Sequence, residues 1–203
     1  MSGVSGADAP GVADAHSGTK YRTIVADPPW HYDGFASMPG APGTKRETKI
    51  TNLPYGSMTL AEIADLPVAS LAASDCFLFC WTTNRYLPDT FSIMDGWGFT
   101  YKQTLVWHKT GSPSPFGGSV APNHAEFLLV ATKGKPQVVS RLKGSVFSVP
   151  KPYQHSKKPE AFLDFIEQCA SGPYVELFAR RARFGWDYWG NESLGTASME
   201  EAA

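Results

Sequence analysis

The sequence has no long apolar run, little cysteine and almost no net charge, and each of these absences narrows the class of protein. Its 203 residues include 3 cysteines, an odd number without metal-ligand spacing, so we expect reduced thiols and no metal site. No apolar run approaches the roughly 20 residues of a membrane-spanning helix. The first residues lack the basic start and apolar stretch of a secretory signal. We therefore expect a cytoplasmic protein with no membrane partner.

Charge is balanced over the whole chain but not along it. Lys and Arg number 18 and Asp and Glu 19, for a formal net charge of −1, so the total charge does not attract nucleic acid. Residues 133–183, however, hold ten basic side chains and four acidic ones. Aromatic residues make up 13% of the chain and include 6 Trp. Basic and aromatic side chains together suit nucleic-acid contact, although ordinary protein surfaces carry such charge as well.

Apolar patterning predicts an α/β domain with a largely parallel sheet, because predicted strands alternate with predicted helices. The predicted strands are Tyr21–Asp27, Asp75–Thr82, Thr100–His108, Glu126–Thr132 and Tyr174–Phe178, with shorter ones at Val138–Ser140 and Val146–Val149. The predicted helices are Thr59–Ala73, capped by Thr59 and interrupted at Pro67, then Pro88–Gly96 and Lys158–Cys169. In such sheets ligands bind outside the carboxyl ends of the strands.

The ends of the chain and two internal segments lack this periodicity. Residues 1–19 and 194–203 are predicted to be disordered tails around a single domain at 20–193. The segments 31–56 and 111–123 are rich in Gly and Pro and are predicted to be loops. Loops of this length inside a compact domain are usually functional, so we expect them to contribute to a substrate surface.

The sharpest motif is Asp27-Pro28-Pro29-Trp30, which directly follows the first predicted strand. Two prolines fix φ near about −65° and remove two backbone donors, so the turn offers the Asp27 carboxylate and the Pro28 carbonyl as acceptors. Trp30 adds a flat aromatic surface. Such a site suits an exocyclic amine on a planar base, because acceptors on its N–H groups free the delocalised lone pair and stabilise the charge that develops during attack. A plain strand-to-loop turn is the alternative interpretation.

Further motifs follow in a fixed order along the chain. They are LPYG at 53–56, FLFCW, VWHKT at 106–110, HSKKPEAF around Lys158, and VELFARR followed by WDYWGN. With VADPPW, they resemble the family of S-adenosylmethionine-dependent N6-adenine methyltransferases typified by the catalytic subunit of the eukaryotic mRNA adenosine methyltransferase. The order, with the catalytic motif first, also resembles the β-class of DNA amino-methyltransferases. The resemblance covers nearly all of residues 20–193 and implies a single Rossmann-like domain.

The resemblance also implies roles for residues of this chain. Asp27 and the Pro28 carbonyl would hold the target amine, and Pro29 and Trp30 would shape the base pocket. Tyr55 and Lys109 would contact the substrate as well. Contacts to S-adenosylmethionine are implied for five residues: Asp27, Lys158, Phe178, Arg180 and Asn191. Among these, Lys158 resembles the lysine that pairs with the cofactor's carboxylate.

Adenine in a polynucleotide is the substrate that the resemblance implies. DNA is favoured over RNA, because a small stand-alone chain resembles bacterial and phage members, which act in the cytoplasm of a bacterium or of a phage-infected cell. RNA methylation by the same chemistry, methylation of the cytosine amine and a non-catalytic nucleic-acid-binding subunit are the alternatives. Family members often pair, so we expect a homodimer or a heterodimer.

Overall fold

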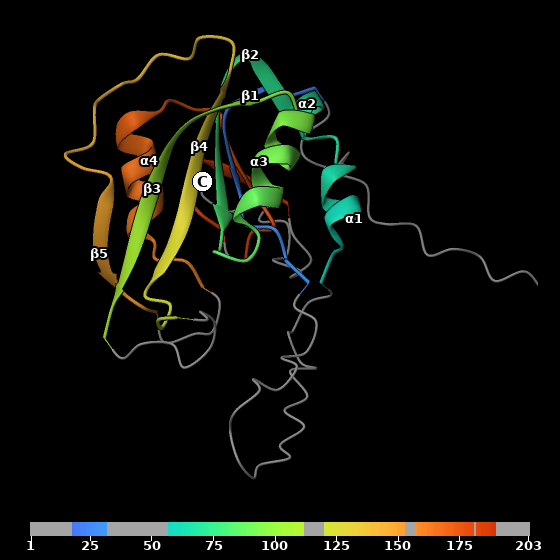
Figure 1. Ribbon diagram of the computed structural model, residues 1–203. Helices are drawn as coiled ribbons and strands as arrows, with labels where there is room; N and C mark the ends of the chain where they lie inside the picture. Colours follow the sequence, from blue (N-terminus) through green and yellow to red (C-terminus); the bar gives the residue numbers. More distant parts are fainter. Residues whose placement is uncertain (1–17, 32–56, 112–119, 153–156, 181, 190–203) are drawn as a thin grey trace, which may run out of the picture.

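A seven-stranded sheet forms the centre of the molecule (Figure 1). The computed structural model describes residues 18–31, 57–111, 120–152, 157–180 and 182–189. The strands within these ranges are β1 (Tyr21–Ala26), β2 (Ala72–Thr82), β3 (Thr100–Thr110), β4 (Ala125–Lys133), β5 (Val146–Pro150), β6 (Tyr174–Leu177) and β7 (Trp186–Trp189). The helices are α1 (Leu60–Ala64), α2 (Val68–Leu71), α3 (Leu87–Gly96) and α4 (Ala161–Cys169).

The strands lie in the order β5-β3-β4-β2-β1-β6-β7. Only β4, among the described strands, runs antiparallel to its neighbours, β2 and β3. The other four neighbouring pairs are parallel. The prediction of one α/β domain with a mostly parallel sheet and flanking helices is therefore confirmed.

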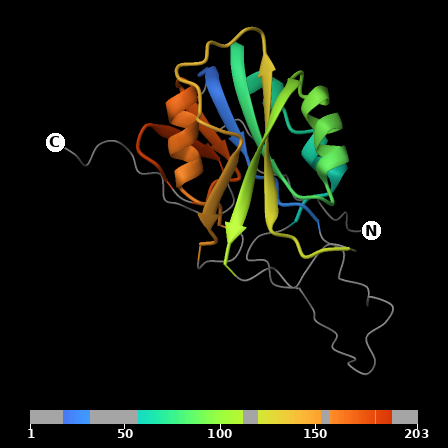
Figure 2. The ribbon, with the colours of Figure 1, turned by 60° about the vertical axis from the view of Figure 1, so that its left-hand side comes forward.

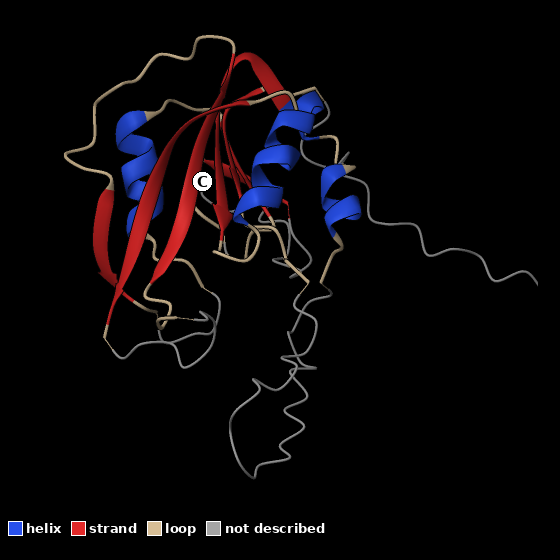
Figure 3. Ribbon diagram, viewed as in Figure 1, coloured by secondary structure: helices blue, strands red, loops and turns tan. Residues whose placement is uncertain are grey.

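Helices cover both faces of this sheet (Figures 2 and 3), with α4 on one side and α1 and α3 on the other. Strand β2 serves both layers, because successive side chains of a strand point to opposite faces. Cys76, Leu78 and Cys80 pack with the side chains of α1, α2 and α3. Phe77, Phe79 and Trp81 pack with those of α4. An uninterrupted apolar run is what a strand buried on both faces requires.

The segment predicted as one interrupted helix, Thr59–Ala73, forms α1 and α2, which are separated at Pro67. Thr59 caps α1 as predicted: its Oγ1 accepts from the Glu62 N–H at 3.2 Å, and the Glu62 carboxylate accepts from the Thr59 N–H at 2.7 Å. This capping box satisfies two donors that a helix start would otherwise leave without a partner.

Replacing Thr59 with alanine is expected to destabilise the protein by about 1 kcal/mol, because the cap at the start of α1 is lost. Urea denaturation should show a lower midpoint with an unchanged slope. An unchanged midpoint would mean that α1 is held by the packing of its buried Ile63 rather than by its cap.

Other boundaries differ from the prediction for local reasons. Helix α4 begins at Ala161 rather than Lys158, because the residue before a proline, here Pro159, is disfavoured in helical backbone. The strand predicted at Val138–Ser140 is wrong: these residues lie outside every strand, and the Val138 and Val139 side chains are exposed. Strand β7 was not predicted.

Several expectations fall on parts of the chain about which the structure gives no description. The predicted tails lie largely outside the described residues, as do 32–56 and 112–119 of the two predicted loops. Among the helices of the described ranges, none has the length and apolar character needed to cross a membrane.

Candidate active site

The carboxyl ends of β1, β2, β3 and β6 meet at one edge of the sheet, and the antiparallel strand β4 begins there (Figure 1). Strands β1 and β6 are neighbours, and the chain leaves their carboxyl ends in opposite directions, toward β2 and toward β7. Such a point in a doubly wound sheet opens a crevice in which ligands bind. Asp27 and Phe178 directly follow these two strands.

A chain of alternating charges lies at this edge. The Lys158 ammonium donates to both carboxylate oxygens of Asp27, at 2.7 and 2.8 Å, and lies 3.4 Å from Oε2 of Glu126. Glu126 in turn pairs with Lys109. The four side chains come from distant parts of the sequence and are only 14–18% exposed. Buried charges require such partners, and here two anions and two cations balance.

The charge chain shifts the pKa values of Lys158 and Glu126. Burial alone would lower the pKa of Lys158, but the charges of Asp27 and Glu126 outweigh it and raise that pKa. Burial would likewise raise the pKa of Glu126, but Lys158 and Lys109 bring it below its usual range. Lys158 is therefore an ammonium and Glu126 a carboxylate at neutral pH.

Two tryptophans support the cations of this chain. The Lys158 ammonium lies 5.4 Å from the centre of the Trp81 ring, and that of Lys109 lies 5.0 Å from the centre of the Trp107 ring. Trp107 is fixed in turn, because its Nε1 donates to the Val149 carbonyl at 2.8 Å. A cation over an aromatic face is stabilised by the ring quadrupole, so the α4 side of the core contributes directly to the site.

Two backbone hydrogen bonds hold the turn after β1. The Pro28 carbonyl accepts from the Trp30 N–H at 2.9 Å, and the Pro29 carbonyl accepts from the Met58 N–H at 2.9 Å. One acceptor position of the Pro28 carbonyl is therefore occupied, which the sequence reasoning did not anticipate. A carbonyl has two, so this atom can still accept from a ligand.

Trp30 lies in the core rather than on an open wall. It is 5% exposed, and its ring stacks on Tyr86 at 5.1 Å with an interplanar angle of 13°. Tyr86 also donates from its hydroxyl to the His31 carbonyl. These contacts hold the turn in place from the α3 side of the sheet. Direct contact between Trp30 and a base stays a prediction.

The predicted cofactor residues are brought together as far as the structure describes them. Phe178 follows β6 in the left-handed region, with φ of 63°. Arg180 lies close enough to Lys158 for its positive charge to act on the pKa of Lys158 in the lowering direction. Tyr55 and Asn191 lie outside the described residues.

Glu126 was missed as a site residue. In the sequence it is only the first residue of a predicted apolar strand, and the motif reasoning did not include it. The antiparallel register places it opposite Trp107 of β3, beside Lys109 and at the same edge as Asp27. A carboxylate at the start of an apolar strand could have marked Glu126 as a candidate. Only the direction of the strand, however, shows that Glu126 lies at the same edge of the sheet as Asp27.

The cysteines are unsuited to nucleophilic chemistry. Burial raises the pKa of the Cys76 thiol to about 12 and that of Cys169 to about 11. Burial, with the charge of Asp27, also raises the pKa of Cys80. Thiolate is the reactive form, so these groups are almost entirely unreactive at neutral pH. In the portions of the chain that the structure describes, no group of three or more His, Cys, Asp and Glu could hold a metal ion.

The native protein is expected to react with Ellman's reagent at pH 8 at least about 100-fold more slowly than the protein unfolded in guanidinium, because a thiol of pKa near 11 is only about one-thousandth ionised there. All three thiols should react after unfolding. A native thiol that reacts at the rate of a free cysteine would contradict this description of the core.

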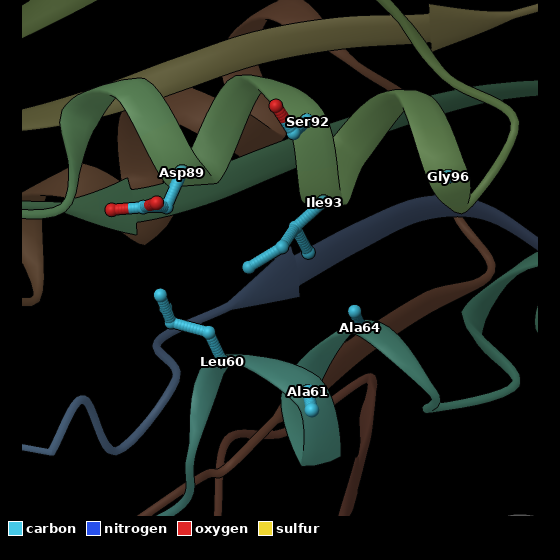
Figure 4. A pocket seen from close by; sticks show the side chains of 7 residues that line it. All are labelled: Leu60, Ala61, Ala64, Asp89, Ser92, Ile93 and Gly96. Carbon is cyan, nitrogen blue, oxygen red and sulfur yellow. The ribbon is translucent and has the colours of Figure 1, made fainter.

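A pocket of about 300 Å³ lies between two helices. Figure 4 shows its lining, which is Leu60, Ala61 and Ala64 of α1 and Asp89, Ser92, Ile93 and Gly96 of α3. None of these seven residues belongs to the charge chain or to the predicted site.

Comparison with known proteins identifies the family of this chain. The family model MT-A70 matches residues 21–192, a range that contains Asp27, Glu126, Lys158 and Phe178. The chain belongs to the MT-A70 family. The methyltransferase family to which the motifs were assigned, and the enzymatic activity of methyl transfer, are thereby confirmed.

Three curated relatives illustrate the range of the family. The chain is 35% identical over 187 residues to "Type II methyltransferase M.MunI" of Mycoplasma sp, covering 85% of this chain and 78% of that protein. It is 28% identical to the mouse "N(6)-adenine-specific methyltransferase METTL4", covering 90% of this chain and 40% of METTL4. It is 27% identical to the catalytic subunit METTL3 of the human N(6)-adenosine-methyltransferase, covering 87% and 29%. The chain thus spans less than half of the two mammalian relatives.

Proposed function

We propose that this MT-A70 protein transfers a methyl group from S-adenosylmethionine to the N6 amine of adenine in DNA. The observation that carries the proposal is the Asp27 carboxylate. It is fixed at the carboxyl edge of the sheet by Lys158 and followed by the rigid Pro28-Pro29 turn. The names of METTL4 and METTL3 specify adenine or adenosine N6 as the position methylated by those relatives.

Asp27 retains the capacity to hold an amine while Lys158 is bound. A carboxylate has about four acceptor positions, and Lys158 uses one on each oxygen. The remaining positions, with the second lone pair of the Pro28 carbonyl, can accept the two N–H groups of an exocyclic amine. Those hydrogen bonds strengthen as the nitrogen becomes positive during attack, so they favour the transition state over the ground state.

The residues at this edge also fit the proposed cofactor. S-adenosylmethionine supplies an activated methyl group on a sulfonium, and its other parts are an ammonium, a carboxylate and an adenosine. Lys158 and Arg180 are cations suited to the carboxylate, Asp27 is suited to the ammonium, and the Phe178 ring is suited to the adenosine. All four residues lie at or beside the ends of β1 and β6, where a doubly wound sheet binds its ligand.

DNA is favoured over RNA by the similarity to M.MunI. Of the three relatives described above, this type II methyltransferase is also the one whose length the chain covers most fully, at 78%. A duplex substrate would present its adenine only after the base is flipped out of the stack, whereas a single strand would not need this step. RNA is the alternative substrate, because the name of METTL3 specifies adenosine. The experiment below distinguishes RNA from DNA.

The test is a methyl-transfer assay with deuterated-methyl S-adenosylmethionine and matched duplex DNA, single-stranded DNA and RNA. Nucleoside mass spectrometry should find the label in N6-methyldeoxyadenosine. Label in RNA alone would overturn the choice of DNA, and label in N4-methylcytosine would overturn the choice of adenine. A wild-type chain that labels none of the substrates would contradict the proposed function as a whole.

A further inference from the structure

Phe178 adopts a backbone conformation that its residue type disfavours. Its φ of 63° is the only positive φ of a non-glycine residue in the described ranges. The left-handed region costs an L-residue roughly 1–2 kcal/mol, and such conformations persist only where the surroundings impose them. They are concentrated at functional sites, and Phe178 directly follows β6 at the ligand-binding edge.

The surroundings that impose this conformation come from the last residue of β7. Trp189 pairs in register with Leu177, the residue before Phe178. Its carbonyl accepts from the N–H of Ala179, the residue after Phe178, at 3.0 Å. Its indole meets the Phe178 ring edge to face, with centroids 5.2 Å apart and an interplanar angle of 69°. Trp189 thus contacts both neighbours of Phe178 through its backbone and the Phe178 ring through its indole. Only the indole contact depends on the identity of its side chain.

The turn that Trp189 holds lies beside the charge chain. The Asp27 N–H points to the Leu177 carbonyl at 3.4 Å, which ties the end of β6 to the start of the Asp27 turn. Two residues after Phe178, the chain brings the Arg180 charge close to Lys158. A change in the backbone conformation of Phe178 would therefore move both the Phe178 ring and the Arg180 side chain relative to Lys158.

We propose that Trp189 is a positioning residue for the methyl donor. It keeps Phe178 in the left-handed conformation and so sets where the Phe178 ring and Arg180 meet the adenosine half of the cofactor. This inference rests on the proposed function, because it takes S-adenosylmethionine as the donor. The contacts of Trp189 described above are with Phe178 and its two neighbours, which lie on the cofactor side of the proposed site, so its effect should fall on cofactor binding and not on binding of DNA.

The same strand provides a matched control. Trp186, at the other end of β7, stacks on Tyr174 at 4.7 Å and 17°, and its Nε1 donates to Glu167 at 2.6 Å. It belongs to the part of the core that packs with α4. Removing either indole deletes a large aromatic side chain from β7, but only Trp189 touches Phe178.

The experiment compares W189A, W189F, W186A and F178A, with the F178A/W189A double variant. Thermal unfolding measures folding, calorimetry with S-adenosylhomocysteine measures cofactor-site affinity without turnover, and kinetics give KM for the donor and for DNA. W189A should weaken S-adenosylhomocysteine binding and raise the donor KM about tenfold, a change of ~1.4 kcal/mol, while KM for DNA stays within about twofold. W189F, which keeps an aromatic edge, should recover most of the affinity.

The double variant tests whether Trp189 acts through Phe178. In the F178A background W189A should add little further loss of affinity, because the residue through which it acts is already gone. W186A should lower the melting temperature without changing the donor affinity of the folded fraction. Unchanged affinity in folded W189A, or an equal loss in W186A, would overturn the inference alone. A wild-type chain that binds no S-adenosylhomocysteine and transfers no methyl group would overturn the proposed function as well.

Discussion

Replacing Asp27 with asparagine is expected to lower kcat at least about 10²–10³-fold, the range typical of losing one preorganised group that stabilises transition-state charge. Asparagine keeps the size of the side chain but removes the negative charge that faces the developing cation. It also replaces one of the two oxygens that accept from Lys158 with an NH2 group, which can only donate. Single-turnover methylation of an adenine-containing DNA duplex would measure the effect on the chemical step.

The matched control for this substitution is D75N. Asp75 is also in the sheet, and its carboxylate accepts from the Lys135 N–H at 2.7 Å, but it lies near the start of β2, at the opposite edge. D75N should retain kcat to within about twofold, because an exposed hydrogen bond far from the site contributes to stability alone. Comparable activity of D27N and D75N would remove Asp27 from the catalytic centre.

Local patterns were sufficient to predict most of the elements and the position of the turn. The apolar run before Asp27 predicts β1, and the Thr59-to-Glu62 spacing predicts the start of α1, because both depend on neighbours in the sequence. Strand β7 contains four residues and no extended alternation, so its pairing with β6 depends on tertiary contacts that the pattern does not contain.

The contacts of the site could be predicted only in part. The motifs singled out Asp27, Lys109 and Lys158 separately. Glu126 connects the two lysines only because β4 runs antiparallel to its neighbours, which the motifs do not show. Trp30 was expected to present a flat aromatic surface beside the acceptors of the turn. Its burial against Tyr86 comes from α3, more than fifty residues away in the sequence. The motifs thus gave candidate site residues, and only packing determined what each one contacts.

The replacement of Lys158 with methionine should have a comparably large effect, on stability as well as on activity. Methionine keeps an apolar stem against Trp81, but it leaves the largely buried Asp27 carboxylate without its lysine and Glu126 paired with Lys109 alone. Removing one partner of a buried ion pair typically costs about 3–5 kcal/mol, so urea denaturation at pH 8 should show a loss of that order. The K157M variant is the control, because Lys157 is more exposed and its one ion pair described here, with the surface residue Glu160, is long at 4.0 Å. K157M should lose less than about 0.5 kcal/mol of stability.

The pH dependence of stability should further distinguish K158M from the wild type. In the wild type the raised pKa of Lys158 gives stability that is fully present below the ordinary lysine value, about 10.4, and is lost only as pH rises through the folded value. The lowered pKa of Glu126 gives stability that is present above the ordinary glutamate value, about 4.3, and is lost as pH falls through the folded value. Between about pH 5 and 10, the contribution of Lys158 and Glu126 to the free energy of unfolding should therefore be constant.

K158M should respond less to acid than the wild type. Without Lys158, only Lys109 holds down the pKa of Glu126, so that pKa should be lowered less than in the wild type. The stability that the wild type gains from the ionised carboxylate is lost as pH falls through the folded pKa of Glu126, so the difference in the free energy of unfolding between the wild type and K158M should shrink as pH falls from about 5 to 3. In the E126Q background, the part of this change that arises from Glu126 should be absent. A K158M variant whose stability parallels that of the wild type over this range would show that the ammonium does not hold the two carboxylates together.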